Sequence, residues 1–165
     1  MDSLKIKTVT PDDKYNVLEV YRQCEDFLAL GPQPKASLEM VLKDIGESHK
    51  EGGAFQGIYA GDRMIGVVSY ITKGFEGNLT NAFLSLLMII PSFRGKGRGT
   101  KIVGIVEKEI LADSRVKTIL SAVQANNSDA LRFWEKNGYR IVSEPELRPD
   151  GTTVFQLRKS RQTKS

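Results

Sequence analysis

An almost wholly apolar run from Ala82 to Ile90 passes directly into a segment rich in glycine and basic residues, and an amphipathic stretch follows from Gly99 to Ala112. A run without regularly alternating polar positions predicts a central strand that is covered on both faces. In the stretch that follows, apolar residues recur at the spacing of a helix. The sequence therefore predicts a buried strand, a tight connection and a helix in immediate succession.

The connection between this strand and this helix is suited to an anionic ligand. Gly95, Gly97 and Gly99 let the backbone pass close to a ligand and adopt dihedral angles that other residues avoid. The N–H groups in the first turn of a helix point at a bound anion, helped by the positive end of the helix dipole. Four basic side chains add positive charge at the same place: Arg94, Lys96, Arg98 and Lys101.

The glycine spacing narrows the kind of phosphate ligand. A P-loop requires G-x-x-x-x-G-K-[ST] and a dinucleotide fingerprint requires G-x-G-x-x-G, and the segment supplies neither order. The pattern that remains, R-x-x-G-x-G from Arg94 to Gly99, resembles the pyrophosphate-binding signature of the GNAT family of N-acetyltransferases. For this segment alone, a basic, glycine-rich surface turn is the alternative.

A second segment further along the chain carries the same resemblance. Residues 127–139 read N-S-D-A-L-R-F-W-E-K-N-G-Y, which looks like the other signature of that family. They predict a short helix, since Asn127 is a good N-cap and Gly138 ends it. Its apolar side consists of Ala130, Leu131, Phe133 and Trp134. A capped core helix is the alternative for this segment alone, but both signatures in the family's order make residues 80–142 closely similar to it.

The rest of the chain supplies further elements by periodicity and turn signals. They are a strand from Leu4 to Val9, a helix from Asp12 to Leu30, a helix from Ser37 to near Gly52, strands Phe55 to Ala60 and Met64 to Thr72 around the turn Gly61-Asp62-Arg63, a strand from Thr118 to Val123, and a final pair, Tyr139 to Val142 and Thr152 to Leu157, joined through Pro149-Asp150-Gly151. The resulting order, βααβββαβαββ, agrees with the resemblance. The implied fold class is α+β, an α/β sandwich whose mixed, mostly antiparallel central sheet carries helices on both faces.

The chain has 165 residues, of which 40% are apolar and 27% are charged, a composition typical of soluble globular proteins. We expect one acyl-CoA N-acyltransferase-like domain over residues 1–160 and a frayed basic tail over 161–165. The single Cys24 cannot form an intramolecular disulfide, which favours a reducing compartment. Without a long apolar segment or a signal peptide, cytoplasm is the expected location and no membrane partner is expected.

The net charge of +4 favours an anionic ligand without naming one. A nucleic-acid partner is not expected, because no recognisable module and no interleaving of basic residues with aromatics occurs. No metal is expected either, since His, Cys and acidic residues nowhere have ligand spacing. A homodimer is a further expectation, as homodimers are common among soluble proteins.

The resemblance implies acetyl-CoA as co-substrate and an amine of a small molecule or peptide as acceptor. Main-chain groups of the strand end would hold the pantetheine arm, with an N–H near Leu87 polarising the thioester carbonyl. The implied cofactor-binding residues are Leu87, Met88, Ile89, Arg94, Gly95, Lys96, Gly97, Arg98, Gly99, Thr100, Asn127 and Trp134.

The sequence does not assign catalytic groups. Many relatives place a tyrosine as general acid where this chain has Trp134, whose indole N–H cannot release a proton in this range. Three readings stay open: the thiolate leaves unaided, Ser121 or Tyr139 substitutes, or catalysis is lost. The carboxylate expected on a central strand is replaced by Ala122, and the acids of the first helices, Glu19, Glu25 and Glu39, are expected to be solvated. The resemblance makes an N-acetyltransferase the leading hypothesis for the function. The alternative, motivated by Trp134 and Ala122, is an acyl-CoA-binding sensor of the same fold.

Overall fold

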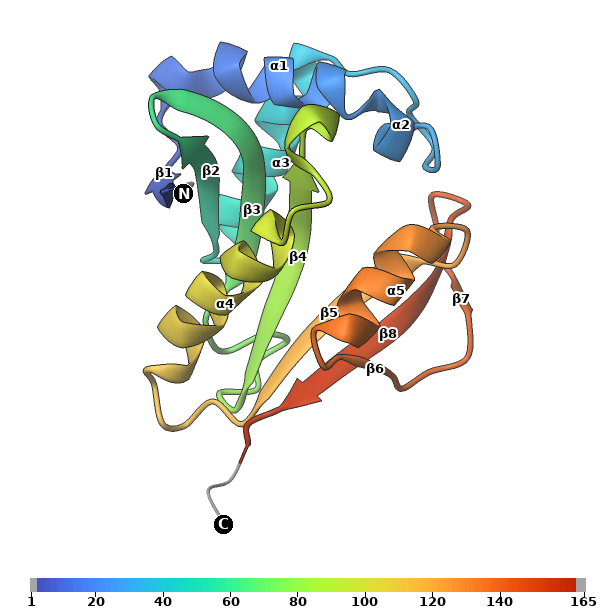
Figure 1. The fold of residues 1–165 in the computed structure, drawn as a ribbon. Helices are drawn as coiled ribbons and strands as arrows, with labels where there is room; N and C mark the ends of the chain where they lie inside the picture. Colours follow the sequence, from blue (N-terminus) through green and yellow to red (C-terminus); the bar gives the residue numbers. More distant parts are fainter. Residues whose placement is uncertain (1–2, 163–165) are drawn as a thin grey trace.

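The computed structural model describes residues 3–162, and a large twisted sheet with helices against it dominates the view (Figure 1). In chain order the elements are β1 (Leu4–Thr8), a 3-10 turn (Pro11–Asp13), α1 (Lys14–Gln23), α2 (Glu25–Leu28), α3 (Leu38–Lys50), β2 (Ala54–Ala60), β3 (Arg63–Ile71), β4 (Asn81–Ile89), a second 3-10 turn (Pro91–Phe93), α4 (Arg98–Leu111), β5 (Thr118–Gln124), α5 (Ser128–Lys136), β6 (Arg140–Ile141), β7 (Glu146–Leu147) and β8 (Thr153–Ser160).

The strands form one sheet in the order β1-β2-β3-β4-β5-β8-β6, with β7 also paired to β8. Every pair is antiparallel except β4 with β5, which is parallel. In Figure 1, α4 and α5 cover one face of the sheet, and α1 and α3 lie on the other. The central strand β3 is buried from Ile65 to Ile71, as a strand with helices on both faces must be.

Buried tyrosines join neighbouring elements through hydrogen bonds to carboxylates. Tyr21 on α1 donates to Asp44 of α3 at 2.7 Å, and Tyr70 on β3 donates to Glu109 of α4. Burial raises the pKa of both Tyr21 and Tyr70 above the ordinary value, and the neighbouring carboxylates add to the shift. These hydroxyls therefore keep their protons at neutral pH and act as fixed donors within the core.

The helix expected from Asp12 to Leu30 is divided, and that prediction was wrong. The chain leaves helical geometry at Cys24 (φ −104°, ψ 24°), so that α1 and α2 are separate. Side chains just beyond the break are held by distant segments: the Glu25 carboxylate accepts from the Ala36 N–H at 2.8 Å, and Asp26 pairs with Arg94. These contacts stabilise a turn that helical periodicity alone would not predict.

The expected final pair of strands was also partly wrong. Tyr139 to Val142 contributes only the two-residue β6, and the turn Pro149-Asp150-Gly151 joins β8 to the extra strand β7 rather than to β6. The long partner of β8 is β5, along the whole stretch from Thr118 to Gln124. β8 therefore lies between β5 and β6, an order that only tertiary pairing establishes.

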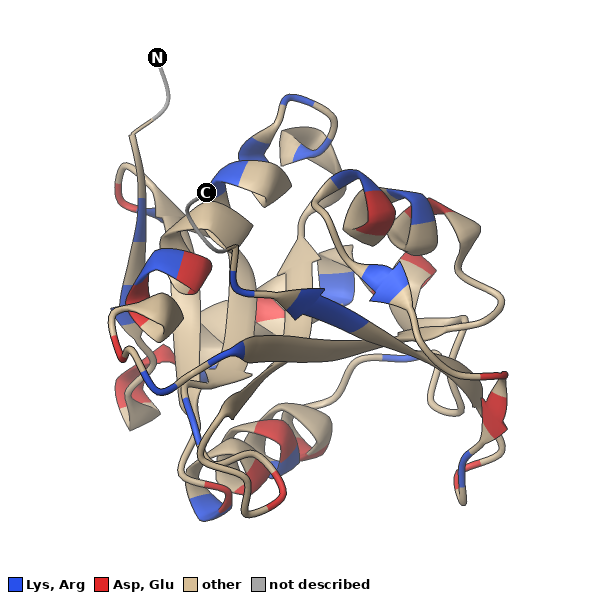
Figure 2. Ribbon diagram, turned by 90° about the horizontal axis from the view of Figure 1, so that it is seen from below, with Lys and Arg blue, Asp and Glu red and all other residues tan. Residues whose placement is uncertain are grey.

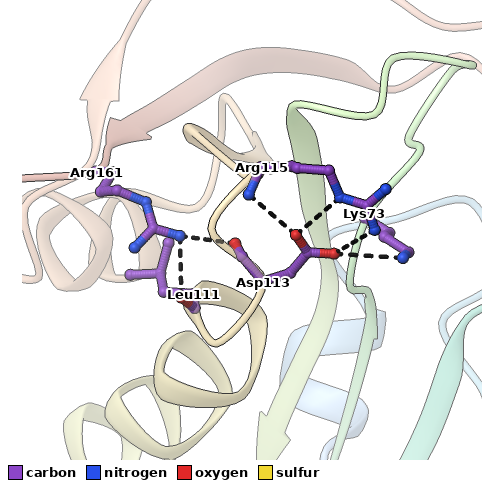
Figure 3. Close-up of polar contacts among 5 residues, drawn as sticks. All are labelled: Lys73, Leu111, Asp113, Arg115 and Arg161. Atoms are coloured by element: carbon purple, nitrogen blue, oxygen red, sulfur yellow. Dashed lines mark hydrogen bonds and ion pairs between the residues drawn. The ribbon is translucent and has the colours of Figure 1, made fainter.

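The basic tail begins later than expected, because Arg161 is fixed. Its guanidinium donates to the carbonyls of Leu111 and Asp113 at 3.0 and 2.8 Å (Figure 3). A further bond, at 2.8 Å, goes to the carbonyl of Val116, so Arg161 holds the C-terminal end of α4 and the segment after it. The Asp113 carboxylate in turn binds Arg115 and Lys73. Gln162 follows as an exposed residue outside any helix or strand, and residues 163–165 of the expected tail lie outside the described residues.

Arg161→Ala is expected to lower the free energy of unfolding by about 1–3 kcal/mol, since hydrogen bonds from a cation to the last carbonyl of α4, at Leu111, and to two carbonyls of the segment after it are lost. The unfolding midpoint in a thermal scan should fall by about 2–4 °C for each kcal/mol. Arg158→Ala is the matched control, because Arg158 is exposed on β8. Equal midpoints for the two variants would show that Arg161 does not stabilise the end of α4.

Candidate active site

A gap opens in the sheet between β4 and β5. Their parallel pairing stops at Leu84 and Ser121. At this point β4 carries a bulge, because Ser69 pairs with Leu86 while Tyr70 pairs with Leu84, which leaves Ser85 as the extra residue. A bulge bends its strand and increases the twist. β4 and β5 consequently diverge beyond Leu84, as Figure 1 shows.

The divergence leaves main-chain groups of β4 facing the gap. The Ile90 N–H donates to Ile65 O of β3, and pairing alternates along an antiparallel ladder, so Leu87 and Ile89 direct their main-chain groups away from β3. The Ile89 carbonyl confirms this direction, because it accepts from Arg94 Nε at 2.6 Å. The Leu87 N–H and C=O thus lie where an extended ligand could pair with them as an added strand would.

The glycine-rich connection forms the N-terminus of α4 at the mouth of this gap. Gly97 is the N-cap with φ 75°, a left-handed conformation that favours glycine. The intrahelical ladder begins with Lys101 N–H donating to Gly97 O at 3.0 Å. The N–H groups of the first turn, at Arg98, Gly99 and Thr100, precede that bond and point outward along the helix axis. They form the anion-binding arrangement that the sequence predicts.

A cleft of about 720 Å³ joins these features. Gly99 lies directly against the Phe133 ring, because a Cβ at Gly99 would be only 2.9 Å from Phe133 Cε1, so a larger residue would have to displace the ring within the cleft. The residues that line the cleft are Asp26, Phe27, Leu30, Leu87, Met88, Ile89, Arg94, Gly95, Gly97, Gly99, Thr100, Asn127, Asp129, Ala130, Phe133, Trp134 and Lys136. An elongated cleft with main-chain donors at a strand end and at a helix N-terminus fits a pantetheine arm followed by a diphosphate.

Most of the residues expected to bind the cofactor line this cleft, but Lys96 and Arg98 do not. Arg98 instead packs over the Phe93 ring and donates to Phe93 O at 3.2 Å. Sequence reasoning missed the contribution of α2, namely Asp26 and Phe27, and of the following loop at Leu30. It also missed Asp129, Ala130, Phe133 and Lys136 as cleft residues, although all four belong to the second signature.

Arg94 has a partner that the sequence did not suggest. Its guanidinium forms two bonds with the Asp26 carboxylate, at 2.6 and 3.2 Å, in addition to the bond to Ile89 O. The guanidinium lowers the pKa of Asp26, chiefly through these hydrogen bonds. Arg94 therefore holds α2 against the glycine-rich connection, and its charge is largely balanced within the protein.

Neither hydroxyl considered as a substitute general acid lines the cleft. Ser121 is buried at the point of divergence and donates to Leu84 O at 2.8 Å. Tyr139 is buried beneath α4 and donates to Glu107 at 2.8 Å. Burial, followed by the charge of Glu107, raises the pKa of Tyr139 above its ordinary value. Both protons are thus committed to interior acceptors.

Trp134 lines the cleft and also packs in the core. Its indole is 7% exposed and makes edge contacts with the rings of Phe133 and Tyr139, with centroids 5.3 and 5.0 Å apart. The acids of the cleft wall, Asp26 and Asp129, are paired with Arg94 and Arg132. For Asp26 the hydrogen bonds from Arg94 lower the pKa, which makes this carboxylate a weaker base.

The charge and composition of the described residues rule out few further functions. Figure 2 shows Lys and Arg beside Asp and Glu on the helices, so charges of both signs are mixed over the view. Among the helices of residues 3–162, none is long and apolar enough to cross a membrane. Within the same part of the chain, no group of His, Cys, Asp and Glu could hold a metal ion.

The chain is similar to known proteins both in sequence and in structure. The sequence pattern of the Acetyltransferase (GNAT) family matches residues 15–139. The spermine/spermidine N(1)-acetyltransferase of Bacillus subtilis strain 168 is 23% identical over 160 residues, which cover 94% of this chain and 99% of that protein. An acetyltransferase from Thermus thermophilus has TM-score 0.81 at 22% identity, covering 98% of this chain and 100% of the other. A spermidine N-acetyltransferase from Vibrio cholerae, solved with CoA and spermine, has TM-score 0.72 at 13% identity, with 95% of both chains covered.

The family match includes both signatures, and the solved structures share the fold. The resemblance drawn from the two motifs is confirmed, and so is the fold class of a mixed, mostly antiparallel sheet with helices on both faces. Acetyl-CoA is accordingly the co-substrate, and acetyl transfer to nitrogen is the chemistry. The chain belongs to the GNAT family of acetyltransferases.

Proposed function

We propose that this protein transfers the acetyl group of acetyl-CoA directly to a primary amine of a small molecule or peptide. The observation that carries the proposal is the cleft bordered by the end of β4, the N-terminus of α4, α5 and α2, which is lined both by strand-end residues around Leu87 and by the helix N-terminus at Gly97–Thr100. Relatives named for spermine and spermidine acetylation support a small polyamine as one acceptor to test first. A cytoplasmic location stays a prediction.

The residues named above have distinct tasks in this reaction. First-turn N–H groups of α4 would hold the diphosphate, and the Leu87 N–H would polarise the thioester carbonyl. Transfer forms a C–N bond and breaks the C–S bond, releasing CoA as its thiol. An amine with pKa near 10.4 needs about 4–5 kcal/mol to be neutral at pH 7, and the cleft wall offers no unpaired carboxylate to take its proton. The proton therefore leaves to water.

The decisive experiment measures release of CoA thiol from acetyl-CoA in the presence of a panel of amines that includes spermidine, spermine and lysine peptides. Calorimetric titration of the same protein with acetyl-CoA gives the affinity independently. Turnover with at least one amine supports the proposal. Tight binding of acetyl-CoA without any turnover would instead favour a sensor, the alternative that Trp134 and Ala122 motivate. No uptake of CoA or acetyl-CoA at millimolar concentration would contradict both.

Trp134→Tyr is expected to leave acetyl-CoA affinity nearly unchanged and to raise turnover by less than about tenfold, because a thiol of pKa near 8.5 gains little from a general acid at neutral pH. Trp134→Phe removes the same ring volume without adding a hydroxyl and is the matched control. The ratio of kcat between the two variants isolates the hydroxyl. A large loss of acetyl-CoA affinity in both variants would show that Trp134 acts mainly by packing.

A further inference from the structure

Asp26 places a negative charge in the cleft that is proposed to hold the diphosphate of acetyl-CoA. It lines this cleft together with the glycine-rich connection and the first turn of α4. Its side chain is 58% exposed, and the hydrogen bonds from Arg94 lower its pKa, so the carboxylate is ionised at neutral pH. An exposed carboxylate repels an incoming diphosphate. Affinity for acetyl-CoA alone therefore gives no reason for an acid at this position.

Asp26 occupies the part of Arg94 that is suited to phosphate. Nη1 and Nη2 of Arg94 donate to the two carboxylate oxygens of Asp26 at 2.6 and 3.2 Å, while Nε donates to Ile89 O at 2.6 Å. The guanidinium fork binds a carboxylate or a phosphate in the same two-bond geometry. Arg94 directly precedes Gly95, and both residues line the cleft. The Asp26 carboxylate and a diphosphate in the cleft consequently compete for one fork.

The Asp26–Arg94 pair acts locally, on the position of α2. Both side chains are partly exposed, and ion pairs of this kind contribute little to the stability of a whole fold. By contrast, α2 (Glu25–Leu28) is a single turn after the break at Cys24, and so short a helix is not stable by itself. The pair ties this turn to the glycine-rich connection, 68 residues away in sequence.

The position of α2 affects the part of the cleft in which the reaction takes place. Phe27 and the following Leu30 line the cleft together with Leu87 and Met88 of β4. The thioester lies near Leu87 in the proposed reaction, so these apolar side chains help to form the space through which an amine approaches it. A shift of α2 therefore changes the acceptor side of the cleft and leaves the N-terminus of α4 in place.

We propose that Asp26 is a positioning residue that holds α2 for the acceptor and lowers the affinity for the cofactor, because it competes with the diphosphate for Arg94. The proposal rests on the proposed function and goes beyond it by coupling the two substrates through one guanidinium. The coupling is reciprocal: a change that separates Asp26 from Arg94 strengthens the hold on the diphosphate and loosens α2. CoA carries the same diphosphate as acetyl-CoA, so Asp26 also speeds the release of this product.

Calorimetric titrations of CoA and of acetyl-CoA test the competition without turnover. Asp26→Asn keeps the size of the side chain but loses the charge, so both Kd values should fall by about three- to tenfold. Asp12→Asn is the matched control, because it makes the same charge change on the exposed turn before α1. This control should leave both Kd values within about twofold of the wild-type values, since distant surface charges are screened.

A double-mutant cycle separates competition for Arg94 from general repulsion between charges. Arg94→Gln removes the cation, and in this background Asp26→Asn should change the Kd of CoA by less than about twofold. The thermal midpoints of all four proteins are compared first, because Arg94 also bonds to Ile89 O. If Arg94→Gln does not fold, Arg94→Lys takes its place, since lysine keeps the charge but lacks the fork. The gain from Asp26→Asn should then be smaller than in the wild-type background.

Two further measurements test the position of α2. Hydrogen exchange over residues 25–30 should be faster in Asp26→Asn than in the wild type, while exchange over α5 stays the same. With the best amine of the panel, Asp26→Asn should lower the KM for acetyl-CoA and raise the KM for the amine by about fivefold. Asp26→Glu restores the charge and should return both KM values toward those of the wild type. A merely structural role of Asp26 would raise both KM values together.

The outcomes distinguish this role of Asp26 from the proposed function. An unchanged or higher Kd of CoA in Asp26→Asn would overturn the proposal, as would the full gain in the Arg94→Gln background. Unchanged exchange over residues 25–30, or KM values that rise together, would do the same. Absence of turnover with every amine would count against the proposed function instead. The Kd values, the cycle and the exchange rates would then still decide whether Asp26 competes for Arg94 and holds α2.

Discussion

Gly99→Val is expected to weaken acetyl-CoA binding by at least about a hundredfold without unfolding the protein. A Cβ at this position would lie 2.9 and 3.1 Å from Cε1 and Cζ of Phe133, the outer end of a ring that also lines the cleft. The ring can swing aside and keep the fold, but it then fills the space in front of the first-turn N–H groups of α4. Losing two charge-assisted hydrogen bonds of about 1.5 kcal/mol each corresponds to that change in affinity.

Gly104→Val in the same helix is the control for this prediction. A Cβ at Gly104 meets no atom within 4 Å, and valine is a better helix former than glycine. Acetyl-CoA affinity, measured by calorimetry, should therefore be unchanged and thermal stability equal or slightly higher. If Gly99→Val binds acetyl-CoA as well as Gly104→Val does, the diphosphate does not lie at the N-terminus of α4, and the assignment of the cleft fails.

The two signatures could be predicted from sequence because their physical basis is local. Gly97 supplies a left-handed N-cap within the connection itself, and the Asn127 side chain accepts from the Ala130 N–H at 3.1 Å within the first turn of α5. Helical periodicity then gives each helix its buried face. The helix caps and apolar faces of the two signatures depend only on residues that are close in sequence. The structure has both helices in the segments for which the sequence predicts them.

The parts that sequence missed depend on contacts between distant residues. The break at Cys24 is accompanied by the pair of Asp26 with Arg94, which are 68 residues apart, so α2 became part of the cleft without any local signal. One signal was present: Ser85 is a polar residue inside an apolar strand, and it is the residue at which β4 bulges and becomes exposed.

Gly66→Ala is expected to lower the free energy of unfolding by about 3 kcal/mol or more, at the upper end for an overpacked core site. A Cβ at Gly66 would lie 2.3 Å from the Met88 carbonyl oxygen and 3.2 Å from both Ile58 Cδ1 and Ile89 Cα. The nearest atom belongs to the backbone of β4, which is paired to β3 at this position and cannot rotate away. The unfolding midpoint should fall by about 2–4 °C per kcal/mol.

Gly57→Ala on the neighbouring strand β2 separates backbone clash from a general cost of adding a methyl group. Its new Cβ would meet Met64 Cε at 2.8 Å and Tyr59 Cε1 at 3.0 Å, which are the ends of side chains that can move. We therefore expect a loss of about 1 kcal/mol or less for Gly57→Ala. Because Met88 and Ile89 line the cleft, the displacement of β4 in Gly66→Ala should also weaken acetyl-CoA binding, whereas Gly57→Ala should not. Similar stability and affinity in the two variants would mean that β4 can shift without cost, and that its main-chain groups are not held in register for a ligand.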